Sequence, residues 1–530
     1  MKKITFALLF ATLPFFGKAQ TAMMTATAEL DAKVFAETIT NDDLKKHLSI
    51  LASDEYEGRE TGEKGQKMAA DYIIKHFKQL GLAAPVQANA ANPYLQTFPL
   101  AKKTWGESYI QKGNTKYELF KDFFAYGDYT QNAEMEFIFV GYGIETEGYS
   151  DYKDIDVKGK IVVAFSDEPK DKDGNFIFSK TKTMSDFARP QAKNKIAKAN
   201  GAAGILHVFE DEKSFKSTLA LYRSYFMAAS MTLVSEEAKS SFGSFYTYPA
   251  VAADLLGSKE KKIQKMIDEI VASRKPVAKK ISNKAKVLMQ RKSQEVMTEN
   301  VLGFMEGTDK KEEILVITAH YDHIGIVDGK INNGADDDGS GTVSVLELAE
   351  AFSIAKQKGF APRRSILFML FTGEEKGLLG SEYYSNNPIF PLKNTITDLN
   401  IDMVGRVDDK HTENPNYIYV IGSDKLSSDL HKLHEDAAKK YAPEIELNYT
   451  YNDENDPNRF YYRSDHYNFA VHNIPIIFYF NGTHPDYHAP TDDVEKINFE
   501  KMEKIDRMIF HTAWELANAE ARPKVDKAEK

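Results

Sequence analysis

Residues 332–341 have the sequence NNGADDDGSG, in which three consecutive aspartates lie between glycine-containing turns. The apolar run at 314–318 predicts a buried strand before this stretch, and the spacing of apolar residues at 340–352 predicts a helix after it. A row of like charges is usually a solvated loop, but His320 and His323 lie just upstream. Carboxylates and imidazoles that gather where a strand ends and a helix begins suggest a metal centre in an α/β protein. Any of the three aspartates is a candidate ligand on this evidence.

The strand–loop–helix pattern repeats through the C-terminal half of the chain. Apolar runs predict further strands at residues 365–371, 399–404 and 474–480. Helical spacing predicts helices at residues 376–385, 426–440 and 499–517. The alternation indicates an α/β fold with a mostly parallel mixed sheet and helices on both faces. Such sheets bind their ligands beyond the carboxyl ends of the strands.

Acidic and imidazole side chains follow the predicted strands, so they are expected at that edge. A single one is most simply a surface charge or a capped turn, but chance does not explain the recurrence at one edge. Two metal ions about 3.5–4 Å apart need a bridging carboxylate, with one further carboxylate and one imidazole for each ion. The residues that match this requirement are His320, Asp337, Glu375, Asp402 and His488.

Two neighbours of this set have expected supporting roles. Asp322 lies two residues after His320 and is placed to accept its ring N–H, which would fix the tautomer. Glu374 cannot share the direction of the adjacent Glu375, so it is available as a general base on a water molecule.

The composition narrows the chemistry. The 530 residues can bury a large core and form two or three units, and the net charge of −10 argues against a nucleic-acid partner. The chain contains no cysteine, so oxygen and imidazole nitrogen must hold any metal.

Residues 1–19 are predicted to be a signal peptide. Two lysines precede an apolar stretch at 4–16 that is too short to span a bilayer, and small residues at 17 and 19 match a cleavage site. No later segment predicts a membrane helix. A secreted or periplasmic protein without a membrane span is therefore expected.

Residues 41–53 and 63–80 have the spacing of helices, and Gly81 is expected to end the second. Short strand-like runs between about 103 and 282 indicate a β-rich module in which titratable residues are scattered. A covering or binding role is expected for this module. Residues 521–530 are a polar tail that is expected to be disordered.

Five motifs resemble those of the co-catalytic dizinc exopeptidases, a family that includes bacterial leucyl-type aminopeptidases and glutamate carboxypeptidases. They are AHYD at 319–322, GADDDGSG at 334–341, GEE at 373–375, NIDMVG at 400–405 and YHAPTD at 487–492. VGYGI at 140–144 and DVKGKIVV at 156–163 resemble a protease-associated domain. The resemblance implies that 20–104 and 283–520 form a peptidase domain of the zinc exopeptidase type. The protease-associated domain, with an α/β fold rich in strands, would be inserted at 105–282.

The resemblance also implies a role for each ligand. Asp337, the middle aspartate, matches the residue that bridges two Zn²⁺ ions. One zinc would also bind Glu375 and His488, and the other would bind His320 and Asp402.

Glu374 matches the family's general base, and Tyr487 matches a tyrosine that hydrogen-bonds the scissile carbonyl oxygen. Arg463 and Asp465 match a segment that contacts substrate. The family has a cis peptide after its bridging aspartate, which implies one at Asp337-Asp338.

The expected function is that of an aminopeptidase acting on peptide substrates. A carboxypeptidase of the glutamate-carboxypeptidase type is the main alternative and would need a cation such as Arg463 to bind a substrate carboxylate. A glutaminyl cyclase with one zinc is disfavoured by the complete set of five ligands. An inactive binding protein on the same scaffold is disfavoured by that set and by the presence of Glu374.

Overall fold

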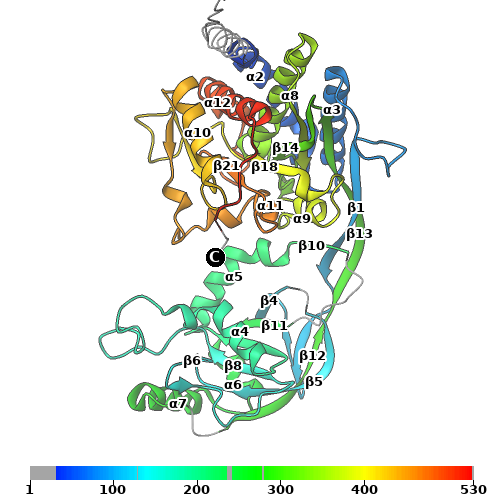
Figure 1. Cartoon of the computed structure of the whole chain (residues 1–530). Coiled ribbons are helices and arrows are strands. Elements are labelled where there is room, and N and C mark those ends of the chain that lie inside the picture. Colours follow the sequence, from blue (N-terminus) through cyan, green and yellow to red (C-terminus); the bar gives the residue numbers. More distant parts are fainter. Residues whose placement is uncertain (1–31, 128, 235–241, 277–279, 528–530) are drawn as a thin grey trace, which may run out of the picture. The chain divides into compact units, whose positions relative to one another are not determined.

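The structure is a computed structural model that describes residues 32–127, 129–234, 242–276 and 280–527 (Figure 1). Its chain forms two compact units, Met1–Pro99 with Met297–Lys530 and Leu100–Val296. The strands β1 (Leu95–Trp105) and β13 (Arg291–Met305) run continuously from one unit into the other. The expected signal peptide at 1–19 lies outside the described residues. Among the described residues, no helix combines the length and apolar character that a membrane span requires.

A mixed sheet forms the centre of the first unit, with the strand order β1-β13-β17-β14-β18-β21-β19-β20. Besides β1 and β13, this sheet contains β14 (Lys310–His320), β17 (Arg364–Phe371), β18 (Thr395–Ile401), β19 (Tyr417–Ile421), β20 (Glu446–Asn448) and β21 (Ile476–Phe480). Neighbouring strands among β17, β14, β18 and β21 are parallel. β13 and β19 are antiparallel to their neighbours β17 and β21. The mostly parallel mixed sheet is therefore confirmed.

Both faces of this sheet are buried, because alternate residues of its strands enter different cores. Leu315 and Ile317 of β14 belong to one apolar cluster, and Val316 belongs to another. The first cluster includes residues of α2 (Asn41–Leu51), α3 (Lys64–Leu80), α8 (Gly341–Gln357), α10 (Ser428–Tyr441) and α12 (Phe499–Asn518). The second includes residues of α9 (Leu379–Asn386) and α11 (Tyr467–Ala470). Helices on both faces were expected and are confirmed.

Local sequence signals set the ends of the N-terminal helices. The Thr40 side chain accepts the main-chain N–H of Asp43 and caps α2. Gly81 ends α3 in the left-handed conformation, with a φ of 74°, as its position in the sequence indicates.

The second unit has an eight-stranded sheet of its own, with the order β3-β2-β12-β5-β8-β9-β11-β4. These strands are β2 (Tyr109–Lys112), β3 (Thr115–Glu118), β4 (Phe123–Tyr126), β5 (Gln131–Phe139), β8 (Ile161–Phe165), β9 (Gly204–Val208), β11 (Gly243–Thr247) and β12 (Ser282–Met289). Its helices are α4 (Pro190–Ala199), α5 (Glu212–Met227), α6 (Pro249–Leu255) and α7 (Glu260–Ser273). The short strand β10 (Ser230–Leu233) pairs with residues 100–103 of β1.

Two sequence expectations differ from the structure. Residues 283–296 were assigned to the peptidase domain but lie in the second unit, because β12 pairs with β5 from Ser282↔Ile138 to Met289↔Gln131. The tail was expected to be disordered, yet its described part is held by hydrogen bonds. Arg522 donates to the main-chain oxygens of Lys393 and Thr395, and Asp526 accepts the main-chain N–H of Ser428.

Candidate metal centre

The carboxyl ends of four parallel strands bring the candidate side chains together. His320 is the last residue of β14, and Asp402 directly follows β18. Glu374 and Glu375 lie in the turn after β17, and Tyr487 and His488 lie in the segment after β21. Parallel strands end at the same edge of a sheet, so this chain order produces one cluster.

The aspartate stretch forms the turn η3 (Ala335–Ser340) directly before α8. Both flanking glycines are required by close approach. A Cβ on Gly334 would lie 2.3 Å from the main-chain oxygen of Asp337, and a Cβ on Gly341 would lie 2.2 Å from that of Ile401. The Asp337-Asp338 peptide bond is cis, as the family resemblance implies.

The outer two aspartates have their oxygens occupied by hydrogen bonds. Asp338 accepts main-chain N–H groups from His320, Gly341 and Met403, at 3.2, 2.8 and 3.1 Å. Asp336 accepts hydrogen bonds from the Ser340 hydroxyl and the Gly405 N–H through Oδ1, and its Oδ2 lies 3.1 Å from Nε2 of His484. Asp337 is therefore the member of the row left to face the cluster.

Asp337 is held by its backbone. Its own N–H and that of Asp336 donate to the buried carboxylate of Asp492, at 3.1 and 2.9 Å. The fully buried Arg59 donates to the main-chain oxygens of Asn333 and Gly334 just upstream. These contacts fix the Asp337 side chain without using its oxygens.

His320 forms one part of the cluster. Its Nε2 lies 3.4 Å from Asp337 Oδ1, and it lies 3.7 Å from both Glu374 Oε2 and Asp402 Oδ1. Its Nδ1 lies 3.0 Å from the main-chain oxygen of Asp322, which commits Nδ1 as the donor and directs Nε2 at the carboxylates. The expected contact is therefore made by the backbone of Asp322. The Asp322 carboxylate instead accepts hydrogen bonds from the Thr61 hydroxyl and, at 3.3 Å, the Glu374 N–H.

Asp337 and Glu375 form the other part, together with two histidines. His488 Nε2 lies 3.0 Å from Asp337 Oδ2 and 3.2 Å from Glu375 Oε2. His323 Nδ1 lies 2.7 Å from Glu375 Oε1 and 3.9 Å from Asp337 Oδ2. The sequence analysis assigned no role to His323. Its position directly after the AHYD motif could have identified it as a further candidate ligand. His323, Asp337 and Glu375 together form a group able to hold a metal ion.

The donor set suits zinc. Asp337 Oδ2, Glu375 Oε1 and both ring nitrogens of His323 are buried without a hydrogen-bond partner in the described part of the chain, even though they lie close together. His323 Nδ1 lies 2.7 Å from Glu375 Oε1 and 3.9 Å from Asp337 Oδ2, so one cation could contact these three atoms. Imidazole nitrogens and carboxylate oxygens are ordinary zinc ligands, and a cation would balance the buried carboxylates.

Burial and neighbouring charges shift the pKa values of two groups at the centre. Burial raises the pKa of Glu374 well above its usual value, and the carboxylates of Asp402 and Glu375 add to that effect. Burial opposes charge on His488 as well, but Asp337 and Glu375 outweigh it and raise the pKa of that imidazole to about 10.

A cavity of about 30 Å³ opens beside these residues. Its polar lining includes Asp337, Glu374 and Asp402, and its apolar lining is Met403, Phe460, Phe478 and Phe480. Tyr487 and Arg463 also line it, and the Arg463 guanidinium donates to the Tyr487 hydroxyl at 3.3 Å. Burial raises the pKa of the Tyr487 hydroxyl, and the carboxylates of Asp337 and Glu375 raise it further, so it stays protonated.

The comparisons with known proteins agree with this geometry. Residues 300–513 match the sequence model of peptidase family M28. This part of the chain is similar in sequence to that family. "Aminopeptidase YwaD" of Bacillus subtilis is 29% identical over 238 residues, which cover 43% of this chain and 47% of the relative. A "Probable leucine aminopeptidase" of Trichophyton verrucosum is 30% identical over 219 residues, which cover 40% and 56%. The chain thus spans about half the length of these curated relatives.

A likeness of fold to two solved structures extends over nearly the whole chain. The solved "Aminopeptidase from Aneurinibacillus sp. strain AM-1" matches with a TM-score of 0.54 at 18% identity, covering 94% of this chain and 97% of that one. A zinc aminopeptidase from Bacillus subtilis, BSAP, matches with a TM-score of 0.50 at 19% identity, covering 93% and 98%. At these identities the likeness establishes the fold alone.

Asp465 and its neighbour Ser464 differ in how they meet the centre. Asp465, expected to contact substrate, is fully buried and is absent from the described lining of the cavity. Its neighbour Ser464 reaches the centre instead, where it donates to Asp402 Oδ2 at 2.6 Å and accepts from the Asn400 amide at 2.9 Å. The side chains of adjacent residues point in different directions, and this explains why Ser464 and Asp465 have different surroundings.

Proposed function

We propose that this chain is an exported aminopeptidase that uses two zinc ions to release residues from the N-terminus of peptides. The observation that carries the proposal is the composition of the cavity. Three carboxylates line it, and Arg463 is the one cationic side chain in its described lining. With Asp337 and Asp402 bound to zinc, Glu374 is the free carboxylate in this lining, and it would favour a substrate ammonium group over a substrate carboxylate.

Five residues would hold the two zinc ions. Asp337 would be shared, Glu375 and His488 would complete one site, and His320 and Asp402 would complete the other. Bound zinc supplies Lewis-acid polarisation of a carbonyl oxygen and lowers the pKa of water. The place of His323 beside Glu375 makes it a further candidate for the first site.

Glu374 moves the proton. Its carboxylate lies 3.7 Å from His320 Nε2 at the cavity, and its main-chain N–H is held by Asp322. It would accept a proton from the attacking water and return it to the leaving amine. Tyr487, kept protonated by its surroundings, would donate a hydrogen bond to the carbonyl oxygen as negative charge develops on it.

The aromatic wall indicates the side chain that is accepted. Phe460, Phe478 and Phe480 face the space next to the carboxylates. An apolar first residue would place its side chain against these rings while its ammonium group lies near Glu374.

A carboxypeptidase is the second candidate, and Arg463 is the observation that favours it. Its guanidinium lines the cavity. Among the described residues, it donates a hydrogen bond to the Tyr487 hydroxyl and none to a carboxylate. It could pair with a substrate C-terminus.

The test uses Glu374→Gln with Glu382→Gln as an exposed control on α9. We expect Glu374→Gln to retain its zinc, measured by inductively coupled plasma mass spectrometry, and to lose turnover by about 10²–10⁴-fold. Peptides with a free N-terminus should be cleaved by the parent enzyme, and N-acetylated peptides should not. Cleavage of N-acetylated peptides that depends on a free C-terminus would favour the carboxypeptidase, and full activity of Glu374→Gln would exclude the assigned base.

Export and the nature of the second unit belong to the same proposal. We expect the mature protein to be secreted or periplasmic and to begin at Gln20, which N-terminal sequencing of the exported protein would check. The second unit is proposed to be a protease-associated domain, on the motifs at 140–144 and 156–163.

A further inference from the structure

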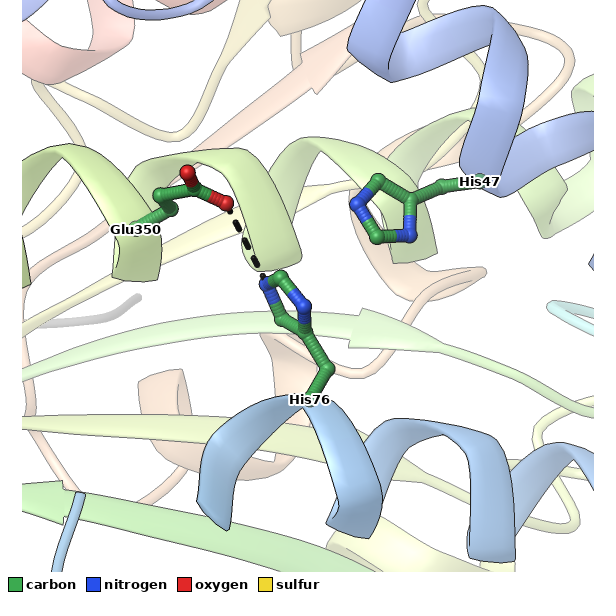
Figure 2. A group of neighbouring side chains, drawn as sticks. All are labelled: His47, His76 and Glu350. Atoms are coloured by element: carbon green, nitrogen blue, oxygen red, sulfur yellow. Dashed lines mark ion pairs between the residues drawn. The ribbon is translucent and has the colours of Figure 1, made fainter. Parts of the chain in front are cut away.

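A separate group of metal-binding side chains lies on three helices of the first unit (Figure 2). It comprises His47 of α2, His76 of α3 and Glu350 of α8. Each contributes one possible ligand atom, and these atoms lie within 4.8 Å of one another. None of the three belongs to the motifs or to the candidate metal centre described above.

A fourth side chain, Glu347, lies one turn before Glu350 on α8. Its Oε1 lies 3.5 Å from His47 Nε2, and Glu350 Oε2 lies 3.8 Å from His76 Nε2. His47, His76 and Glu347 are 5%, 8% and 1% exposed. His47 thus faces a buried carboxylate, and His76 faces a partly exposed one.

These atoms are not satisfied by one another. His76 Nε2 and Glu347 Oε1 are buried without a hydrogen-bond partner in the described part of the chain. Buried polar groups are normally hydrogen-bonded, because an unpaired one loses its hydration without compensation. Each of these atoms therefore lacks a partner that a bound cation could supply.

The opposite sides of the two rings are already committed. His47 Nδ1 lies 2.7 Å from the Tyr72 hydroxyl, and the His76 ring hydrogen-bonds with the main-chain oxygen of Leu346. Metal-binding histidines characteristically donate their second ring N–H to an oxygen in this way, which fixes the tautomer and frees the other nitrogen for the metal. Each ring of this group lies within hydrogen-bonding reach of an oxygen that can accept such an N–H, the Tyr72 hydroxyl for His47 and the Leu346 carbonyl for His76.

We propose that His47, His76, Glu347 and Glu350 bind an additional divalent transition-metal ion, with Zn²⁺ as the best match, that joins α2 and α3 to α8. Two imidazole nitrogens with carboxylate oxygens form a normal four-coordinate zinc site. Zinc–ligand distances of about 2.0–2.2 Å place neighbouring ligand atoms about 3.4 Å apart in a tetrahedron. The separations of 3.5 and 3.8 Å are close to this value, and the ligand atoms of His47, His76 and Glu350, which lie within 4.8 Å of one another, would draw together around the ion.

The position gives the ion a structural role. α8 begins directly after η3, the turn that carries Asp337. An ion bound on α8 would therefore fasten the two N-terminal helices to the helix that starts at the candidate metal centre. The site does not depend on the proposed peptidase activity.

The test counts zinc in the full-length protein after dialysis against buffered zinc. His76→Gln and Glu350→Gln are each made in the parent chain and in an Asp337→Asn background. We expect each to lower the zinc content by about one ion per chain in both backgrounds. His511→Gln is the matched control, because His511 is a similarly buried histidine, 5% exposed, that lies outside the group. It should leave the zinc content unchanged.

A second measurement separates metal loss from misfolding. Zinc added to the chelated Asp337→Asn protein should raise its melting temperature, and the added His76→Gln change should abolish that rise. Glu350→Gln serves if His76→Gln fails to fold, because the Glu350 side chain is 40% exposed. Unchanged zinc content in both foldable variants would overturn the proposal. Zinc loss from His76→Gln but not from Asp337→Asn would uphold it and contradict the assigned catalytic centre instead.

Discussion

Asp336, Asp337 and Asp338 are chemically identical, and their surroundings give them different roles. The outer two accept hydrogen bonds from the turn, from α8 and from the segment after β18. The middle one directs its carboxylate toward His320 and His488. The sequence alone shows three equal candidates, because the difference arises from contacts with residues that are distant in the chain.

The three aspartates should therefore respond differently to the same substitution. Asp337→Asn is expected to keep the fold and lose the zinc of the catalytic centre, because the shared ligand is removed. Asp338→Asn turns an amide N–H₂ toward main-chain donors, and an unsatisfied buried group costs about 1–3 kcal/mol. It should lower the free energy of unfolding in urea. Equal zinc loss with equal destabilisation in the two variants would contradict this division.

Arg59 has a structural role that charge alone does not reveal. Its guanidinium donates to the main-chain oxygens of Tyr321, Leu51, Asn333 and Gly334, at 2.7–2.9 Å. Lysine offers a point charge without the planar fork and cannot reproduce this set.

Arg59→Lys should destabilise the first unit by about 3 kcal/mol, because several buried oxygens lose their donors. Urea unfolding measures the loss. Arg363→Lys is the control, because Arg363 makes solvent-screened ion pairs with Asp309 and Glu520 that contribute little to stability. Similar losses for both variants would show that the carbonyl contacts of Arg59 are unimportant.

At the scale of elements, periodicity predicted the central strands and the major helices. Apolar runs such as 314–318 are buried on both sides, and that property is visible in the sequence. Three features could not be seen there. The pairing of β12 with β5 is non-local, the His320 contact uses the backbone of Asp322, and the burial of Asp465 depends on side-chain direction. The cluster at the strand ends was predictable because it depends only on chain order in a parallel sheet.

The strand β9 carries His207, the one histidine of residues 100–296. Burial lowers the pKa of its imidazole to about 3, and Lys193 lowers it further. Below its ordinary pKa of about 6.5 the unfolded chain binds a proton that the folded chain does not. The second unit should therefore lose up to about 1.4 kcal/mol per pH unit as the pH falls from 6.5 toward 3.

His207→Gln removes this group and should flatten that slope. The buried Asp151 has its pKa raised to about 6 by burial and acts in the opposite direction, but it is present in both proteins. The difference in unfolding free energy between parent and variant therefore isolates His207. That difference should shrink by about 1 kcal/mol per pH unit between pH 6.5 and 4.5. A constant difference over this range would rule out a neutral His207 in the folded chain.

The whole molecule contains separate cores. Among the described residues, two apolar clusters consist of residues of the first unit, and three consist of residues of the second. The family match at 300–513 and the candidate metal centre both fall in the first unit. Each unit therefore has the interior it needs to unfold as a cooperative transition of its own.

The two tryptophans of the chain report on the two units separately. Trp514 lies in α12 of the first unit, and Trp105 lies at the end of β1 in the second. A ligand that binds only the folded state stabilises it by about 2.7 kcal/mol at 100 times its dissociation constant. Chelation of zinc should therefore lower the urea midpoint measured in Trp105→Phe, where Trp514 is the probe. The midpoint measured in Trp514→Phe, where Trp105 is the probe, should stay unchanged. Equal shifts in both would mean that the units unfold together, and no shift in either would mean that zinc does not stabilise the first unit.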